Sequence, residues 1–143
     1  MVRRALLLVC ALSLIGCASD FGKKTPEMVQ HIEGSVFKAT ERGYYTTELV
    51  MKPKQPVVGK NKASLIIHDY EANDTPGLKI KIVPKMTNSD VVSNEKPAIK
   101  DAGRGLYLIE NIDLHSPGIW ELRMNISGPR MSDNVTLELP EIN

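Results

Sequence analysis

Apolar and polar residues alternate along three separate segments of the chain, and this pattern restricts the fold more than any other feature. In segments 78–82, 120–126 and 134–139 every second side chain is Leu, Ile, Val, Met or Trp. Successive side chains of a β-strand point to opposite faces of a sheet, so this period is typical of half-buried strands. We expect the apolar faces to form a core around Trp120, the only tryptophan.

Other segments are rich in strand-forming residues and are bounded by turn residues. Segments 44–51, 63–70 and 105–112 contain many Tyr, Thr, Ile and Leu residues. Segment 73–77 reads Asn-Asp-Thr-Pro-Gly and predicts a turn between neighbouring strands, because Pro fixes φ and Gly accepts a positive φ. The sequence therefore predicts an all-β fold, an antiparallel β-sandwich of about seven strands.

The N-terminus has the features of a bacterial lipoprotein signal. Arg3 and Arg4 precede an apolar run over 5–15, which is shorter than the roughly 20 residues of a membrane-spanning helix. The segment Leu14-Ile15-Gly16-Cys17 resembles a lipobox, in which the cysteine thiol receives a diacylglycerol and cleavage occurs just before it. We predict a signal peptide over 1–16, lipid attachment at Cys17, a tether over 17–33 and one β-sandwich domain over 34–143.

Lipid attachment at Cys17 predicts a protein of the bacterial cell envelope. The two or three acyl chains of a lipoprotein cysteine, such as palmitate, hold a protein on a membrane durably, whereas one chain does so only marginally. Ala18 follows the cysteine, and in enteric-type bacteria a residue other than Asp at this position favours the outer membrane. We expect the domain to face the periplasm from that membrane.

The composition excludes several classes of site. Cys10 lies in the predicted signal peptide and Cys17 carries the lipid, so the domain has no thiol for a disulfide, a nucleophile or a thiolate metal site. Without Arg3 and Arg4 the chain has 16 basic and 17 acidic residues, and no basic block indicates nucleic-acid binding. No nucleophile elbow, His-Glu-x-x-His motif or phosphate-binding glycine loop is present, so we expect no enzymatic activity.

Several short segments follow one another in the order found in a known family. They are Pro-Val-Val-Gly-Lys-Asn at 56–61, the turn at 73–77, Val-Pro-Lys-Met at 83–86, Gly-Leu-Tyr at 105–107 and Ser-Pro-Gly-Ile-Trp-Glu-Leu at 116–122. In this order they resemble the YtkA-like domain, which is related to FixH-type proteins, over roughly residues 44–139. The resemblance implies an immunoglobulin-like sandwich in the bacterial envelope and a role in handling heavy metals, especially copper.

The resemblance also points to candidate metal ligands. Many YtkA-like domains carry Met-Pro-x-Met followed by His, and a further Met before the later Pro-Gly. Pro84 and Met86 match this pattern, while Val83 and Ser116 stand at two of the Met positions. Thioether sulfur suits Cu(I) and imidazole suits copper or zinc. Met86 and His115 are therefore the candidate ligands, and copper is the cofactor that the resemblance implies.

The remaining histidines and two further methionines have simpler interpretations. We expect His68 to face outward as a surface residue and His31 to lie near the tether. Met51 and Met124 are expected in the core, because both belong to strand patterns.

Two functions remain open at this point. The first is an envelope-anchored, non-enzymatic accessory factor of the YtkA-like type that takes part in copper handling. The second is a structural or protein-binding sandwich, which contacts an envelope partner through a sheet edge or loops and has no metal role. Dependence of the function on metal would distinguish them.

Overall fold

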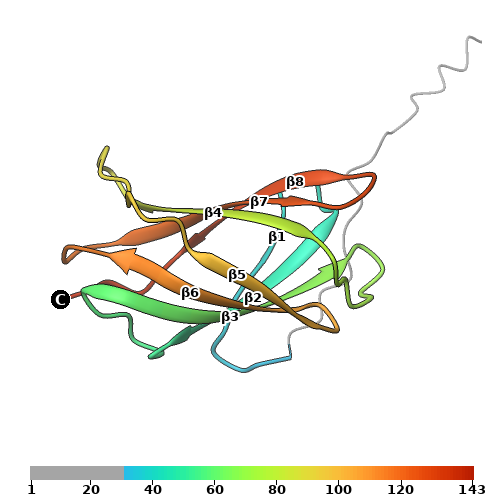
Figure 1. Ribbon diagram of the computed structural model, residues 1–143, viewed down its shortest axis with the longest axis horizontal. Helices are drawn as coiled ribbons and strands as arrows, with labels where there is room; N and C mark the ends of the chain where they lie inside the picture. Colours follow the sequence, from blue (N-terminus) through green and yellow to red (C-terminus); the bar gives the residue numbers. More distant parts are fainter. Residues whose placement is uncertain (1–30) are drawn as a thin grey trace, which may run out of the picture.

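Eight antiparallel strands form two stacked sheets in the computed structural model, which describes residues 31–143 (Figure 1). The predicted signal peptide, Cys17 and most of the tether lie outside the described residues. The predicted all-β sandwich is confirmed. The strands are β1 (Val36–Ala39), β2 (Tyr45–Lys52), β3 (Gly59–Asp69), β4 (Lys79–Met86), β5 (Ala98–Gly103), β6 (Leu106–Leu114), β7 (Trp120–Ser127) and β8 (Ser132–Glu138).

The strand order is that of an immunoglobulin-like sandwich. One sheet has the order β1-β2-β3-β6-β5 and the other has the order β4-β7-β8. Strands β2 to β8 reproduce the four-plus-three arrangement of constant-type immunoglobulin domains, and β1 adds an edge strand beside β2. The turn at 73–77 joins consecutive strands, β3 and β4, but these lie in different sheets and not side by side as expected.

The alternating segments bury their apolar faces between the two sheets. Trp120 and Leu122 of β7 are fully buried, and Met124 and Met51 are nearly so, which confirms that both methionines belong to the core. The other large, fully buried side chains come from both sheets and are Tyr107, Leu49, Leu65, Ile67, Ile109, Ile112, Leu114, Ile126 and Leu137.

The two long sides of the sandwich differ. On one side β1 lies beside β8, where Lys38 Nζ donates a hydrogen bond to the Thr136 carbonyl at 2.9 Å. Just beyond β1, Thr40 Oγ1 donates to the buried carboxylate of Asp133 at 2.6 Å. On the other side β4 and β5 are the outer strands of their sheets. The sandwich is therefore closed along β1 and β8 and open along β4 and β5.

Candidate functional site

The candidate ligands Met86 and His115 lie at the same end of the sandwich, next to Trp120. Met86 is the last residue of β4 and stands opposite Trp120, the first residue of β7. The ring of His115 meets the Trp120 ring edge-on, with ring centroids 5.0 Å apart. The fold thus brings both candidates to one buried indole.

Polar contacts at this end involve neighbouring loop residues. Ser116 Oγ donates to Met86 Sδ at 3.5 Å, and Trp120 Nε1 donates to the Ser116 carbonyl at 3.0 Å. His115 Nδ1 lies 3.7 Å from Asp113 Oδ2, and 42% of the His115 side chain is exposed. Within residues 31–143, no three His, Cys, Asp or Glu side chains are grouped so that they could hold a metal ion. The site therefore offers a thioether and a partly exposed imidazole.

Gly118 fixes the loop that leads into Trp120. Its NH donates to the Ile142 carbonyl at 2.8 Å, and its carbonyl accepts from the Ile142 NH at 2.9 Å. Its φ is +127°, and a Cβ here would lie 2.7 Å from Cε of Met86. A side chain at this position would displace the Met86 methyl group, so glycine is what allows Met86 to pack on the loop.

A second polar cluster, which the sequence did not reveal, lies near the last residues of β3, far from Met86 and His115. Glu48 of β2 and His68 of β3 are both buried on the outer face of the five-stranded sheet. The His31 ring stacks on His68 with centroids 4.7 Å apart, and His68 Nε2 lies 3.3 Å from His31 Nδ1. His68 points away from the core as predicted, but the prediction that it is a surface residue is wrong, because His31 covers it.

Glu48 anchors the segment that contains His31. Its carboxylate accepts hydrogen bonds from the NH groups of His31, at 2.9 Å, and Ile32, and from the Ser35 hydroxyl at 2.9 Å. Burial by itself raises the pKa of Glu48, but these donors together with the charge of His31 outweigh it. The pKa therefore lies below its ordinary value of 4.5.

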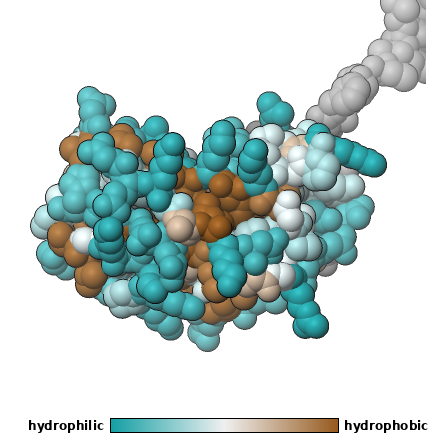
Figure 2. All heavy atoms as spheres, in the orientation of Figure 1, coloured by the Kyte–Doolittle hydropathy of each residue, from teal (hydrophilic) through white to brown (hydrophobic). Residues whose placement is uncertain are grey.

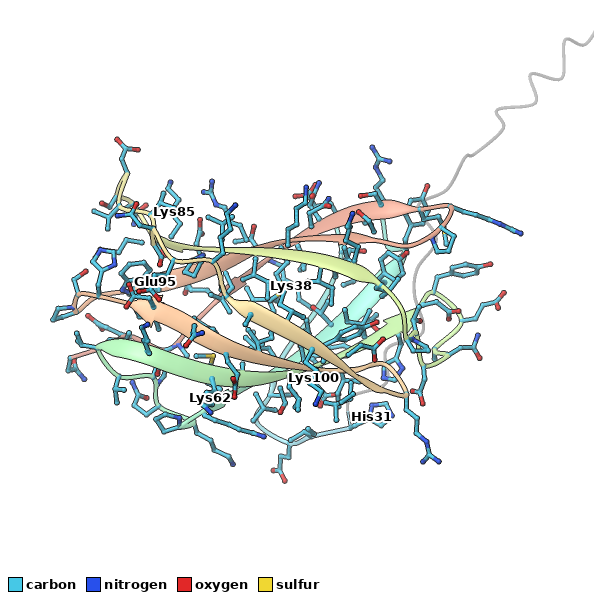
Figure 3. All side chains as sticks on the ribbon, viewed as in Figure 1. His31, Lys38, Lys62, Lys85, Glu95 and Lys100 are labelled. Atoms are coloured by element: carbon cyan, nitrogen blue, oxygen red, sulfur yellow. The ribbon has the colours of Figure 1, made fainter. Side chains whose placement is uncertain are left out.

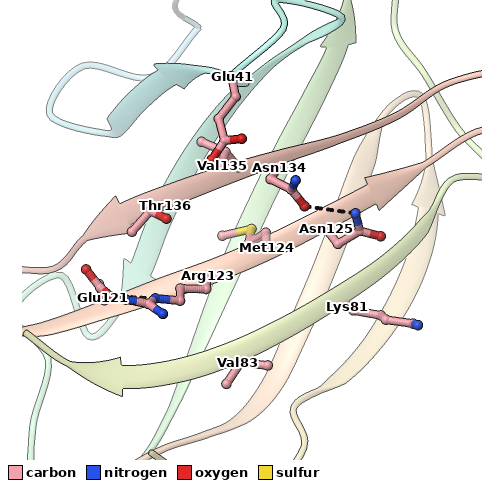
Figure 4. Close-up of a pocket in the computed structure, with 10 residues that line it drawn as sticks. All are labelled: Glu41, Lys81, Val83, Glu121, Arg123, Met124, Asn125, Asn134, Val135 and Thr136. Carbon is pink, nitrogen blue, oxygen red and sulfur yellow. Dashed lines mark hydrogen bonds and ion pairs between the residues drawn. The ribbon is translucent and has the colours of Figure 1, made fainter. Parts of the chain in front are cut away.

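A depression of about 520 Å³ lies on the outer face of the three-stranded sheet (Figure 4). Four of its polar side chains are paired: Arg123 Nε donates to Glu121 Oε1 at 2.6 Å, and Asn125 Nδ2 donates to Asn134 Oδ1 at 2.9 Å. A ligand here would have to replace bonds that already exist. This surface is a weak candidate for binding.

A second hollow of about 390 Å³ opens between β4 and β5. Figure 2 shows hydrophobic atoms at the centre of this face and hydrophilic atoms around them. The apolar lining consists of isoleucines from both edge strands together with a valine and a proline, and lysines complete it. The lining residues are Ile80, Lys81, Ile82, Val83, Lys96, Pro97 and Ile99.

The chain matches no protein-family model, no curated protein and no solved structure. Membership of the YtkA-like family therefore stays a prediction, as does lipid attachment at Cys17. Across residues 31–143 the structure has no helix long and apolar enough to span a membrane.

Proposed function

We propose that this chain is a lipid-anchored, non-enzymatic accessory protein of the bacterial envelope, and that its sandwich binds a partner protein. The sequence of the N-terminus supports the anchor. The hollow between β4 and β5 supports the binding function, because it is concave and largely apolar. Each of the two strands that border it has no paired strand on its outer side. Unpaired strand edges and exposed apolar patches are common sites of protein association.

Site-specific photo-crosslinking in intact cells tests this function. A photoreactive amino acid replaces Lys81, which lines the hollow, or Lys52, an exposed residue at the end of β2 in the other sheet. We expect one identified protein to be crosslinked from position 81 and not from position 52. Equal crosslinking from both positions, or none from position 81, would contradict the proposal.

The lipid anchor is tested by Cys17→Ala. This variant should lose labelling by a fatty-acid analogue and should accumulate as an uncleaved precursor, because the thiol is the attachment point. A variant that is still acylated and processed would refute the anchor.

Weak Cu(I) binding is a second candidate function, favoured by the position of Met86 and His115 beside Trp120. Thioether and imidazole suit Cu(I), and two ligands without further support give a weak site. We expect Cu(I) titration of the full chain, against a competing chelator, to quench Trp120 fluorescence. Met86→Leu should abolish the quenching, whereas Met124→Leu in the core should not. Tight binding that survives Met86→Leu would exclude this site.

A further inference from the structure

The first half of β4 has a free backbone edge. Further along the strand, the edge is covered: the Met86 NH donates to the Val91 carbonyl at 2.9 Å, and the Ser93 NH donates to the Pro84 carbonyl at 3.0 Å. Alternate residues of an antiparallel strand direct their backbone groups to the same side. Those of Ile80 and Ile82 therefore also point away from β7, and no other described strand pairs with them there.

Side chains along this edge alternate in character. Ile80 and Ile82 face the hollow, whereas Lys79 and Lys81 are exposed on the other face of β4, where Lys81 borders both the hollow and the depression on the outer face of the sheet. A strand added beside β4 would place every second side chain over the hollow. Its other side chains would lie next to the lysines, at the roughly 4.5–5.5 Å of cross-strand neighbours. The edge therefore fits a strand with one apolar face and one acidic face.

The charges at the opening favour a foreign acidic segment over a second copy of the chain. Among residues 31–143, Lys79, Lys81, Lys85 and Lys96 take part in no ion pair. Lys85 belongs to β4 and Lys100 to β5, the two strands that border the hollow (Figure 3). Edge-to-edge pairing of two copies would bring the β4 lysines against each other, and like charges oppose such pairing.

We infer that β4 takes up an extended segment of the partner protein as an additional strand, and that this segment alternates apolar and acidic residues. The inference rests on the proposed protein-binding function and specifies the chemistry of the partner. The free edge gives affinity through backbone hydrogen bonds, the hollow receives alternate apolar side chains, and the lysines select for acidic ones.

Peptide binding to the full chain, reconstituted into phosphatidylcholine nanodiscs, tests the inference by fluorescence anisotropy. The probe is a labelled peptide of about eight residues, the length of a long strand, in which valine alternates with glutamate. One control has lysine in place of glutamate, and another has the same composition with the valines and glutamates in separate blocks. We expect the alternating acidic peptide to bind at least roughly tenfold more tightly than either control.

N-methylation of the probe tests for strand addition. Methyl groups on the amides that face β4 block the backbone hydrogen bonds, whereas methyl groups on the alternate amides leave that edge free. The peptide methylated on the amides that face β4 should not bind, whereas the peptide methylated on the alternate amides should bind as the unmethylated probe does. Equal effects of the two methylation patterns would overturn the inference.

Charge reversal tests the lysines. Lys81→Glu should weaken binding of the acidic probe by roughly tenfold and improve binding of the lysine peptide. Lys52→Glu, which reverses an exposed charge on β2, should change neither. Unchanged binding in Lys81→Glu, or equal binding of the alternating and block peptides, would refute the inference. If position 81 crosslinks to a partner but the alternating peptide fails to bind, the inference fails while the proposed function stands.

Discussion

Replacing Trp120 by alanine should remove a large part of the stability of the domain. The indole is fully buried where β4 and β7 meet, opposite Met86. It also contacts the ring of His115 and donates a hydrogen bond to the Ser116 carbonyl at 3.0 Å. Alanine would leave a cavity bordered by these groups and would leave that carbonyl without its donor.

The magnitude follows from the buried area. A buried aromatic side chain removes about 150–250 Å² from water, which at about 25 cal/mol per Å² corresponds to roughly 4–6 kcal/mol. The loss is smaller than this, because alanine keeps its own methyl group and the unfolded chain already buries some area. The lost hydrogen bond increases the loss again by about 1 kcal/mol. We expect the free energy of unfolding to fall by about 4 kcal/mol, a large part of the roughly 5–15 kcal/mol of a typical domain.

Urea unfolding of the full chain, followed by far-ultraviolet circular dichroism, measures this loss. Tryptophan fluorescence is unsuitable because Trp120 is the only tryptophan. Trp120→Phe is the matched control: it keeps an aromatic ring in the core and should cost clearly less, about 1–2 kcal/mol. If Trp120→Ala lost less than about 1 kcal/mol, the indole would not be central to the core, contrary to the burial described above.

Two further predictions concern other contacts. The pKa of Glu48 lies below 4.5 in the fold, so the ionised carboxylate stabilises the fold above that pH, and this contribution is lost as the pH falls. Glu48→Gln should therefore lower the free energy of unfolding by about 2 kcal/mol at pH 7 and by less in acid. Urea unfolding measured between neutral and acidic pH tests this. Gly105→Ala should destabilise more than Gly77→Ala in thermal unfolding. Both residues have φ near +70°, but only at Gly105 would a Cβ lie 2.6 Å from the Ile67 carbonyl and 3.0 Å from the Thr75 nitrogen; equal losses would show that the backbone adapts.

The strands that could be predicted are those in which the core itself sets the pattern. In β7 every second residue from Trp120 to Ile126 is buried, so burial and sequence have the same period. The short β1 and the edge strand β5 were not predicted as separate strands. In β5 only Ile99 packs against the core, since its neighbours lie at the open side of the sandwich, and one apolar residue gives no period.

The His68 cluster and the hollow could not be predicted, because both arise from contacts between distant parts of the chain. A local sequence pattern carries no information on such contacts. His68 has the strand position of a surface residue, but it is buried where the His31 ring stacks on it and Asp74 lies beside it. The hollow likewise arises because β4 and β5 lie in different sheets and neither has a second neighbour. The lysines of β4 were visible as one half of an alternation, but nothing in that pattern indicated that the strand has a free edge.

The motifs that suggested a YtkA-like domain have structural roles in this fold. The Tyr107 hydroxyl donates to the Thr75 carbonyl at 2.7 Å and accepts from the Leu78 NH at 3.0 Å, which holds the crossing from one sheet to the other. At the opposite end of the sandwich, Gly118 exchanges two backbone hydrogen bonds with Ile142, and Trp120 is buried in the core. Residues that serve packing can persist while ligands change, because sandwiches host unrelated functions. These motifs therefore account for the fold of this chain, whereas its function has to be argued from surfaces, and the free edge of β4 with its apolar hollow and unpaired lysines is the surface on which the proposed partner would bind.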